Sequence, residues 1–424
     1  MIERNGYLNK LIRNMWSGDI KVITGIRRCG KSTLLFDIFK DYLLHEKVQS
    51  ENIIEIQLDQ RKNFKFRDPI LLCNYVEDKI SSRRSEKFYL FIDEVQLTNK
   101  TKYEDDVNTE VSIYDMLNEL KSYKNLDTYV TGSNSRGLSK DIATEFRGRA
   151  TQIHVHPLSF SEFFSTQNNT LEISLENYMI YGGLPRVLSI NSNEDKNEYL
   201  KSLFSEVYMK DILERNNIEN IDALGEILNF LASQIGSLTN PNKIANTINS
   251  LSKTRLTSTT VTSYIKAIED SFLVNEARRF DIKGKSYFAY PSKYYFEDLG
   301  LRNSRLNFRQ YDPGHLMENL IYNELITRGC AIDVGVVKER SSGENSNREI
   351  DFVVNKGTKK TYIQSALRMD TEDKEAIELR SLELAKDFFK KVVIRNDIHN
   401  SFYDQTGIFH LSLGDFLLDK ESIF

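Results

Sequence analysis

Residues 19–34 read DIKVITGIRRCGKSTL, and this stretch decides the fold class of the chain. Residues 19–26 are an apolar run typical of a buried strand, and the residues from Lys31 onward carry the apolar stripe of a helix. Between them, residues 25–32 match the pattern G-x-x-x-x-G-K-[S/T] in the strand–loop–helix context that marks a phosphate-binding loop. The sequence therefore predicts a parallel α/β sheet built around such a loop.

The residue types in this loop suit a nucleoside triphosphate. Gly25 and Gly30 permit turns that point backbone N–H groups at phosphate oxygens, and the following helix adds its partial positive charge. Lys31 is expected to reach the β- and γ-phosphates, and Ser32 to ligate Mg²⁺. The adjacent Arg27 and Arg28 face either phosphate or solvent. We expect ATP and Mg²⁺ as ligands, with contacts from Gly25, Arg28, Cys29, Gly30, Lys31, Ser32 and Thr33.

A second motif lies in residues 89–94, which read YLFIDE, a hydrophobic strand that ends in two acids. In proteins with a phosphate-binding loop, an acid at the position of Asp93 holds Mg²⁺. Glu94 is placed to activate water as a general base. The alternative is a solvated acid pair that merely ends a strand. Since the loop lies about 60 residues upstream, we favour the catalytic interpretation.

Strands and helices alternate to about residue 155, as a parallel sheet requires. Further strands are predicted at 51–59 and 127–133, and further helices at 68–79 and 113–124. Residues 98–112 are polar and acidic. We predict a flexible surface insertion there, as a pore loop or without function.

Composition excludes several classes of protein. The 424 residues have a formal net charge of −4, so the chain is no general polycation that coats nucleic acid, although a local basic face is compatible with it. Cys29, Cys73 and Cys330 are too few and too scattered for a disulfide framework or a C-x-x-C zinc site. The charged N-terminal segment does not resemble a signal peptide, and no run reaches the roughly 18 apolar residues of a membrane span. A cytoplasmic protein without membrane contact is expected.

The strings VITGIRRCGKSTLL, LFIDEVQ, VTGSNS, FRGR, HPLSFSEF and YGGLPR resemble an AAA+-type ATPase family. Its members join an ATPase module to a C-terminal domain of unknown function, and they are related to archaeal-type ATPases. The resemblance covers nearly the whole chain. It implies an ATP-hydrolysing motor or switch that assembles as a homo-oligomer.

The resemblance also implies roles for residues outside the loop. Ser133 and Asn134 correspond to a sensor that orients the attacking water, or they form a strand-terminal turn. Arg147 and Arg149 correspond to the arginine-finger region, where an Arg reaches the γ-phosphate of a neighbour, or they are surface arginines. Arg186 corresponds to a second sensor or lid contact, or to a structural turn before a helix.

Residues 241–290 resemble a winged helix, with helices at 243–251 and 257–271 and a wing whose tip is Gly284. We weigh contact between residues 241–293 and the backbone of double-stranded DNA against packing of this module as a lid or assembly element. The basic bias of the region comes from Lys253, Arg255, Lys266, Arg278, Arg279, Lys283, Lys285 and Lys293.

The last third resembles a PD-(D/E)XK nuclease core. Glu318 on a helix, Asp351 on a strand and Gln364 on the next strand follow the order of residues that cluster around Mg²⁺ in such a core. The position of the expected lysine is Ala366, and Arg368 on the same strand face is no equivalent point charge. We therefore expect a degenerate site that binds or supports structure, with cleavage as the alternative.

Four parts follow from these patterns: an AAA+-like ATPase core at 1–156, a helical lid at 157–235, a winged-helix-like module at 236–312 and a nuclease-like α/β domain at 313–424. The predicted function is Mg²⁺-dependent ATP hydrolysis. One alternative is a nucleic-acid-binding protein or nuclease gated by ATP. Another is a signalling ATPase that acts on an unknown protein partner.

Overall fold

The computed structural model describes the chain apart from residues 1, 104–105, 133–148, 217, 252–254 and 342–343. The chain forms two compact units. Unit 1 spans Met1–Pro157 together with Asp270–Phe272, and unit 2 spans Leu158–Glu269 and Leu273–Phe424. The finer division with boundaries near 156, 235 and 312 stays a prediction.

Unit 1 contains a five-stranded sheet with the order β2-β3-β6-β1-β7. Every pairing in it is parallel, which confirms the predicted α/β fold. Since β6 lies between β1 and β3, the carboxyl ends of these three strands meet at one edge, where ligands of open α/β sheets bind. The strands are β1 (Ile20–Thr24), β2 (Ile53–Gln57), β3 (Phe88–Asp93), β6 (Leu126–Thr131) and β7 (Ala150–His154).

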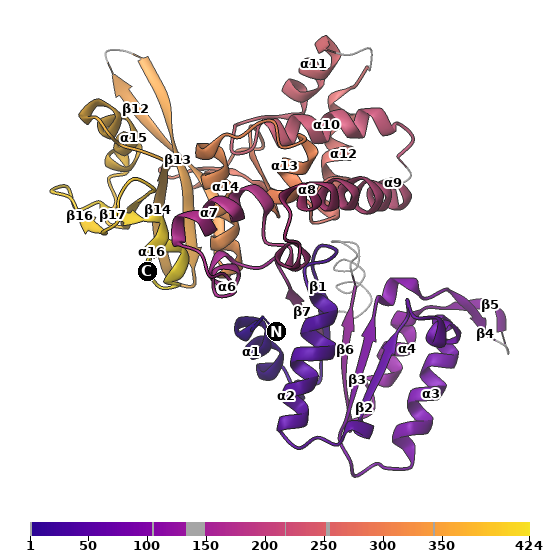
Figure 1. Cartoon of the computed structure of the whole chain (residues 1–424). Coiled ribbons are helices and arrows are strands. Elements are labelled where there is room, and N and C mark those ends of the chain that lie inside the picture. Colours follow the sequence, from indigo (N-terminus) through magenta and orange to yellow (C-terminus); the bar gives the residue numbers. More distant parts are fainter. Residues whose placement is uncertain (1, 104–105, 133–148, 217, 252–254, 342–343) are drawn as a thin grey trace. The chain divides into compact units, whose positions relative to one another are not determined.

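Helices cover both faces of this sheet (Figure 1). Successive side chains of a strand point to opposite faces, and all residues of β3 are buried, so both faces need a covering layer. One face packs Leu90 and Ile92 of β3 against α3 (Pro69–Ser81) and α4 (Ile113–Leu120). The other face packs Phe91 of β3 against aromatic rings of η1, a π-helical turn. The helix after the loop comprises η1 (Thr33–Phe39) and α2 (Lys40–His45), and α1 (Asn5–Arg13) precedes the sheet.

The segment 98–112, expected as a flexible surface insertion, has regular structure in its described residues. They form a β-hairpin of β4 (Thr101–Tyr103) and β5 (Asp106–Val111), in which Thr101 pairs with Val111. The polar composition did not indicate these strands, because strand pairing is made by backbone groups.

The N-terminal part of unit 2 is helical. Its helices up to the first strand are α6 (Phe160–Phe164), α7 (Leu171–Tyr181), η5 (Pro185–Ser189), α8 (Asn193–Ser202), η6 (Leu203–Met209), α9 (Lys210–Asn216), α10 (Ile221–Ser233), α11 (Pro241–Leu251) and α12 (Ser258–Asp270). Helices α11 and α12 coincide closely with the two helices predicted for a winged helix, although that assignment stays a prediction.

The C-terminal part of unit 2 is an eight-stranded sheet with the order β10-β9-β12-β13-β14-β15-β17-β16. Its strands are β9 (Arg279–Asp281), β10 (Ser286–Tyr287), β12 (Ala331–Ser341), β13 (Glu344–Lys356), β14 (Lys359–Ala366), β15 (Lys390–Arg395), β16 (Phe402–Tyr403) and β17 (Phe409–Ser412). The α/β character expected of this region is confirmed. The expected wing is divided: its hairpin β9–β10 pairs in parallel with β12, whereas β11 (Lys293–Phe296) pairs with β8 (Val274–Ala277).

Helices from the segments between and beside these strands pack on the sheet (Figure 1). A core cluster joins Leu379 and Leu382 of α15 (Glu372–Leu384) to Val353 and Val393 of the strands. The remaining helices of the region are α13 (Leu299–Arg305), α14 (Pro313–Thr327) and α16 (Leu413–Leu418). No helix in the described part of the chain has both the length and the apolar character that a bilayer crossing requires.

Candidate functional site

The predicted phosphate-binding loop forms a tight turn directly after β1. Its backbone has positive φ at Gly25 (+144°), Arg28 (+66°) and Gly30 (+99°). A Cβ atom on Gly25 would lie 2.2 Å from the carbonyl oxygen of Val155, so no larger residue fits there without displacing the chain that follows β7. The exposed side chain of Arg28 extends from the middle of the turn.

Lys31 directs its ammonium group over the inside of this turn. Its Nζ atom donates to the carbonyl oxygens of Gly25 at 3.0 Å and Ile26 at 2.9 Å, and the residue is only 5% exposed. The helix begins at once, because the N–H of Leu34 donates to the carbonyl oxygen of Gly30 at 2.9 Å. Loop, lysine and helix N-terminus therefore form one concave, positively charged turn, which is the arrangement that binds phosphate.

Arg4, which precedes α1, holds the outer side of the loop. Its guanidinium group is buried and donates to the carbonyl oxygens of Cys29 at 3.1 Å and His156 at 3.0 Å. The Cys29 side chain is also buried, with its Sγ atom 3.2 Å from the carbonyl oxygen of Val155. Sequence analysis missed Arg4, since a single Arg before a helix carries no motif.

Asp93 lies at the carboxyl end of β3 and is 4% exposed. Burial raises the pKa of Asp93, while hydrogen bonds from the hydroxyl groups of Thr131 and Ser32 act in the opposite direction. A buried carboxylate gains from a nearby cation, and together with the Ser32 hydroxyl it provides the oxygen ligands that Mg²⁺ prefers. The donor set at this edge of the sheet thus fits Mg²⁺.

Glu94 follows with left-handed backbone angles, φ 56° and ψ 51°, which are uncommon for a non-glycine residue and concentrate at functional sites. Its N–H donates to Thr131 Oγ1 at 3.2 Å, and Gln96 Nε2 donates to its carboxylate. Thr131, at the end of β6, therefore contacts both acids. Sequence analysis did not identify Thr131, which the parallel pairing of β3 and β6 brings to the acids. Its own candidates after this strand, Ser133 and Asn134, lie outside the described residues.

Three of the residues assigned by resemblance, Ser133, Asn134 and Arg147, lie outside the described residues. Arg149 is exposed, and its carbonyl oxygen accepts hydrogen bonds from the N–H of Ile20 at 3.4 Å and from Lys121 Nζ at 3.1 Å. The side chain of Thr33 is also exposed. Their roles at a nucleotide stay predictions.

Arg186 is exposed on unit 2 and donates to Ser189 Oγ at 3.2 Å. The glycines before it have a packing explanation, since a Cβ atom on Gly182 would lie 2.3 Å from Asp298 Oδ1. The buried Asp298 carboxylate accepts a hydrogen bond of 2.7 Å from the N–H of Gly183. This supports the structural-turn alternative for the glycines and leaves the sensor role of Arg186 a prediction.

Unit 2 brings the residues of the predicted nuclease-like site together in a buried cluster. Lys293 Nζ lies 2.8 Å from Glu318 Oε1 and 3.1 Å from Asp351 Oδ1. Gln364 Oε1 accepts a hydrogen bond of 3.4 Å from the N–H of Asp351. Arg368 lies beyond the end of β14 with an exposed side chain, so it does not supply the missing cation.

Lys293 was expected on a basic face, and this expectation is wrong. The residue is 3% exposed and forms ion pairs with Glu318, Asp351 and Glu349. Its position on β11 is set by pairing with β8, which residue spacing does not reveal. The exposed members of the basic set are Arg255, Lys266, Arg278, Lys283 and Lys285.

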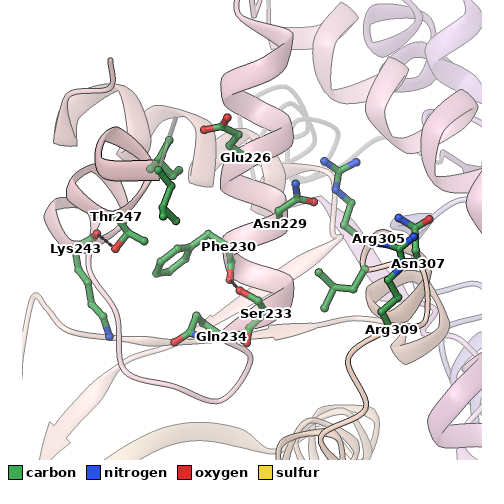
Figure 2. Close-up of a pocket in the computed structure, with 13 residues that line it drawn as sticks. Glu226, Asn229, Phe230, Ser233, Gln234, Lys243, Thr247, Arg305, Asn307 and Arg309 are labelled. Atoms are coloured by element: carbon green, nitrogen blue, oxygen red, sulfur yellow. Dashed lines mark hydrogen bonds between the residues drawn. The ribbon is translucent and has the colours of Figure 1, made fainter. Parts of the chain in front are cut away.

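A separate cavity of about 680 Å³ lies in unit 2 beside α10. Figure 2 shows its lining: Phe230 projects from α10 and Gln234 directly follows that helix, Lys243 projects from α11, and Arg305 and Arg309 from the end of α13 and the segment after it. Three cationic side chains thus share the lining with one acid, from α10. The Arg305 Nε atom is buried and has no hydrogen-bond partner, although Nη2 donates to the carbonyl oxygen of Gly225 at 2.8 Å.

Comparison with known proteins places the chain in a family. A model for an AAA domain matches residues 17–164, and a model for a domain of unknown function, DUF8612, matches residues 172–312. An uncharacterized protein of Haemophilus influenzae is 31% identical over 413 residues, 96% of each chain. An uncharacterized protein of Methanocaldococcus jannaschii is 29% identical over 392 residues, 89% of this chain and 80% of the other.

The structure of the Aeropyrum pernix ORC1 protein in complex with DNA is similar over 72% of this chain and 92% of that chain, with a TM-score of 0.29 and 11% identity. A similarity this low carries no inference about function. The two matching domain models and the Haemophilus influenzae relative together show that the chain belongs to a family of AAA+-like, P-loop ATPase-type proteins that carry this C-terminal domain of unknown function.

Proposed function

We propose that this chain binds ATP with Mg²⁺ and hydrolyses it. The proposal is carried by the convergence of Lys31, Ser32 and Asp93 at the carboxyl ends of β1 and β3, within a loop whose positive φ values suit phosphate. The family supports nucleotide binding, and the geometry supplies the residues for each step.

Each residue has one task in this proposal. The Lys31 ammonium group binds the β- and γ-phosphate oxygens, while the Ser32 hydroxyl and the Asp93 carboxylate hold Mg²⁺, which neutralises developing phosphate charge when bound. Glu94 accepts a proton from the attacking water. Thr131 fixes both acids, because its hydroxyl donates to Asp93 and accepts from the N–H of Glu94.

The test is phosphate release by purified full-length protein. Lys31→Ala is expected to abolish nucleotide binding, and Glu94→Gln to retain binding while turnover falls by about 10²-fold or more. Arg13→Ala, on the exposed side of α1, is the matched control and should behave as wild type. Unchanged phosphate release in both site variants would remove the ATPase proposal.

Homo-oligomeric assembly with an arginine finger is part of the same proposal. Arg149 is exposed, and its neighbour in the motif, Arg147, lies outside the described residues. Mixing Arg149→Ala protein with Lys31→Ala protein distinguishes a finger from a local role. If Arg149 reaches a neighbour, the mixture regains turnover that neither variant shows alone, and the same experiment with Arg147→Ala covers the second candidate.

Binding of nucleic-acid phosphates by unit 2 is a second candidate function. The observation that favours it is the cavity beside α10, whose lining contains Lys243, Arg305 and Arg309 and only one acid. Lys243→Glu and Arg309→Glu are expected to weaken binding of duplex DNA, with the salt slope reduced by about 1 per lost phosphate contact. Lys374→Glu, at an exposed position of α15, is the control. Equal gel shifts for all three variants, or no binding at low salt, would remove this candidate.

A further inference from the structure

The strongest unassigned feature is the buried acid cluster around Lys293 in unit 2. Lys293 Nζ lies 2.7 Å from Glu349 Oε1, 2.8 Å from Glu318 Oε1 and 3.1 Å from Asp351 Oδ1. The three acids come from α14 and β13, whereas the lysine comes from β11, which lies in a different, two-stranded sheet. One ammonium group on β11 therefore joins three carboxylates from two other elements, α14 and β13.

The resemblance to a nuclease core implies a divalent cation at Glu318 and Asp351, so these residues can be tested for fit. Magnesium requires oxygen ligands at about 2.0–2.1 Å in near-octahedral geometry. Here, the carboxylate oxygens that face each other hold an ammonium group between them instead. A divalent cation would have to displace a positive charge that is 3% exposed. The residues as arranged do not fit the metal.

Two further hydrogen bonds reach the Glu318 and Asp351 carboxylates. The Tyr295 hydroxyl donates to Glu318 Oε1 at 2.6 Å, and the N–H of Ser365 donates to Asp351 Oδ2 at 2.9 Å. A Cβ atom added to Gly236 would lie 3.0 Å from Glu318 Oε2, so the backbone covers that side. His315 Nδ1 is 4.0 Å from the same oxygen. These contacts match a satisfied structural network rather than an open ligand site.

Accessibility also separates this cluster from a catalytic one. Glu318 is 8% exposed and Asp351 is 7% exposed, whereas the Glu349 side chain at the rim is 30% exposed. A scissile phosphodiester must contact the metal and the lysine of a nuclease directly. An internal lysine that three carboxylates already surround provides no such contact.

We infer that Lys293 takes the place of the divalent cation and acts as the permanent counter-ion that fastens β11 to α14 and β13. The C-terminal α/β region is then a metal-independent support with no cleavage activity. Ala366 stands where a nuclease core has its lysine, and Lys293 brings an ammonium group to the same cluster from another strand. That ammonium group occupies the space between the acids. This inference is independent of ATP hydrolysis.

The test compares full-length protein with Lys293 intact and with Lys293→Ala. Mn²⁺ binding is measured as the loss of the free Mn²⁺ signal in electron paramagnetic resonance, and stability as the Tm of thermal unfolding. All samples carry Asp93→Asn, which removes the carboxylate proposed to hold the metal at the nucleotide site. With Lys293 intact, Mn²⁺ is expected neither to bind at the cluster nor to raise the Tm. With Lys293→Ala, the Tm should fall, and Mn²⁺ should bind at one added site and raise it again.

Adding Asp351→Asn to Lys293→Ala should abolish both the Mn²⁺ binding and the rise of the Tm on adding Mn²⁺. The inference is overturned if protein with Lys293 intact binds one Mn²⁺ that Asp351→Asn removes, or if it cuts plasmid DNA and Asp351→Asn abolishes the cutting. These two measurements need no lysine variant to fold. Absence of Mn²⁺ binding by soluble Lys293→Ala protein would overturn it as well.

Discussion

The guanidinium group of Arg4 lies 3.1 Å from the carbonyl oxygen of Cys29, so the residue before the first helix is tied to the phosphate-binding loop. The same side chain donates to the carbonyl oxygen of His156, after β7. The loop is thus held between two chain segments that are 152 residues apart. Such pre-organisation lowers the entropic cost of ordering the loop around a ligand.

Replacement of this arginine should weaken nucleotide binding without touching the nucleotide. We expect Arg4→Ala to raise the Kd for ATP on the order of tenfold, or about 1.4 kcal/mol, because the loop loses an anchor. Isothermal titration of wild type, Arg4→Ala and the control Arg13→Ala measures this. An affinity for ATP equal in all three proteins would contradict the anchoring role.

Thr131→Val tests whether the hydroxyl between the two acids positions them. The substitution keeps the shape of a buried side chain and removes the bonds to Asp93 and to the N–H of Glu94. We expect kcat to fall about 10- to 100-fold, as for other groups that orient ligating residues. Thr128→Val, earlier on β6, is the matched control. Equal kcat values for the two variants would show that the hydroxyl has no such role.

The buried ion pair of Lys21 and Asp127 predicts a large loss of stability. Asp127→Ala leaves the ammonium group of Lys21 without its partner in the sheet interior, which typically costs about 3–5 kcal/mol. Trp16 is the single tryptophan, and its backbone N–H donates to Asp127 Oδ2 at 3.0 Å, so its fluorescence reports unfolding of unit 1. The double change Lys21→Met with Asp127→Ala should recover part of the loss. Equal stability of the wild type and Asp127→Ala would refute this.

Asp298 predicts a pH dependence of unit 2. Burial raises its pKa to about 6, against about 3.9 in an unfolded chain. The folded state therefore binds the proton more tightly, so this stabilising contribution is full below about pH 4 and is lost as the pH rises through 6. Between pH 7 and pH 5, it should add roughly 1 kcal/mol to the unfolding free energy.

Urea unfolding followed by circular dichroism at pH 5 and pH 7 checks this for wild type and Asp298→Asn. Other carboxylates titrate in the same range, so the measured quantity is the difference between the two proteins. That difference should favour the wild type more strongly at pH 5. A difference that is constant or larger at pH 7 would contradict the raised pKa of Asp298.

Local patterns were sufficient for the loop and its strands. The residues from Gly25 to Ser32 and the acids Asp93 and Glu94 are specified by types and spacing, and the structure places them at one sheet edge. Thr131 and Arg4 could not be predicted in the same way. Their contacts depend on strand order and on a partner far away in the chain, which a local pattern does not encode.

The acid cluster shows the same limit in unit 2. The order of Glu318, Asp351 and Gln364 predicted the grouping, but Lys293 lies 25 and 58 residues from the two acids that it bridges. Its charge indicated a basic face, because Lys is rarely buried unless it is paired. Only the pairing of β11 with β8 turns it inward.

The hairpin β9–β10 adds an edge to the eight-stranded sheet, although it precedes β12 by some fifty residues in the chain. A fragment that starts near residue 313 would uncover the flank of β12, with unpaired N–H and C=O groups along it that invite aggregation. The segment that carries β9–β10 and the segment from β12 onward therefore cannot be exchanged independently of each other. Gene fusion or truncation between them should yield insoluble products, and any natural recombination point is expected upstream of β8.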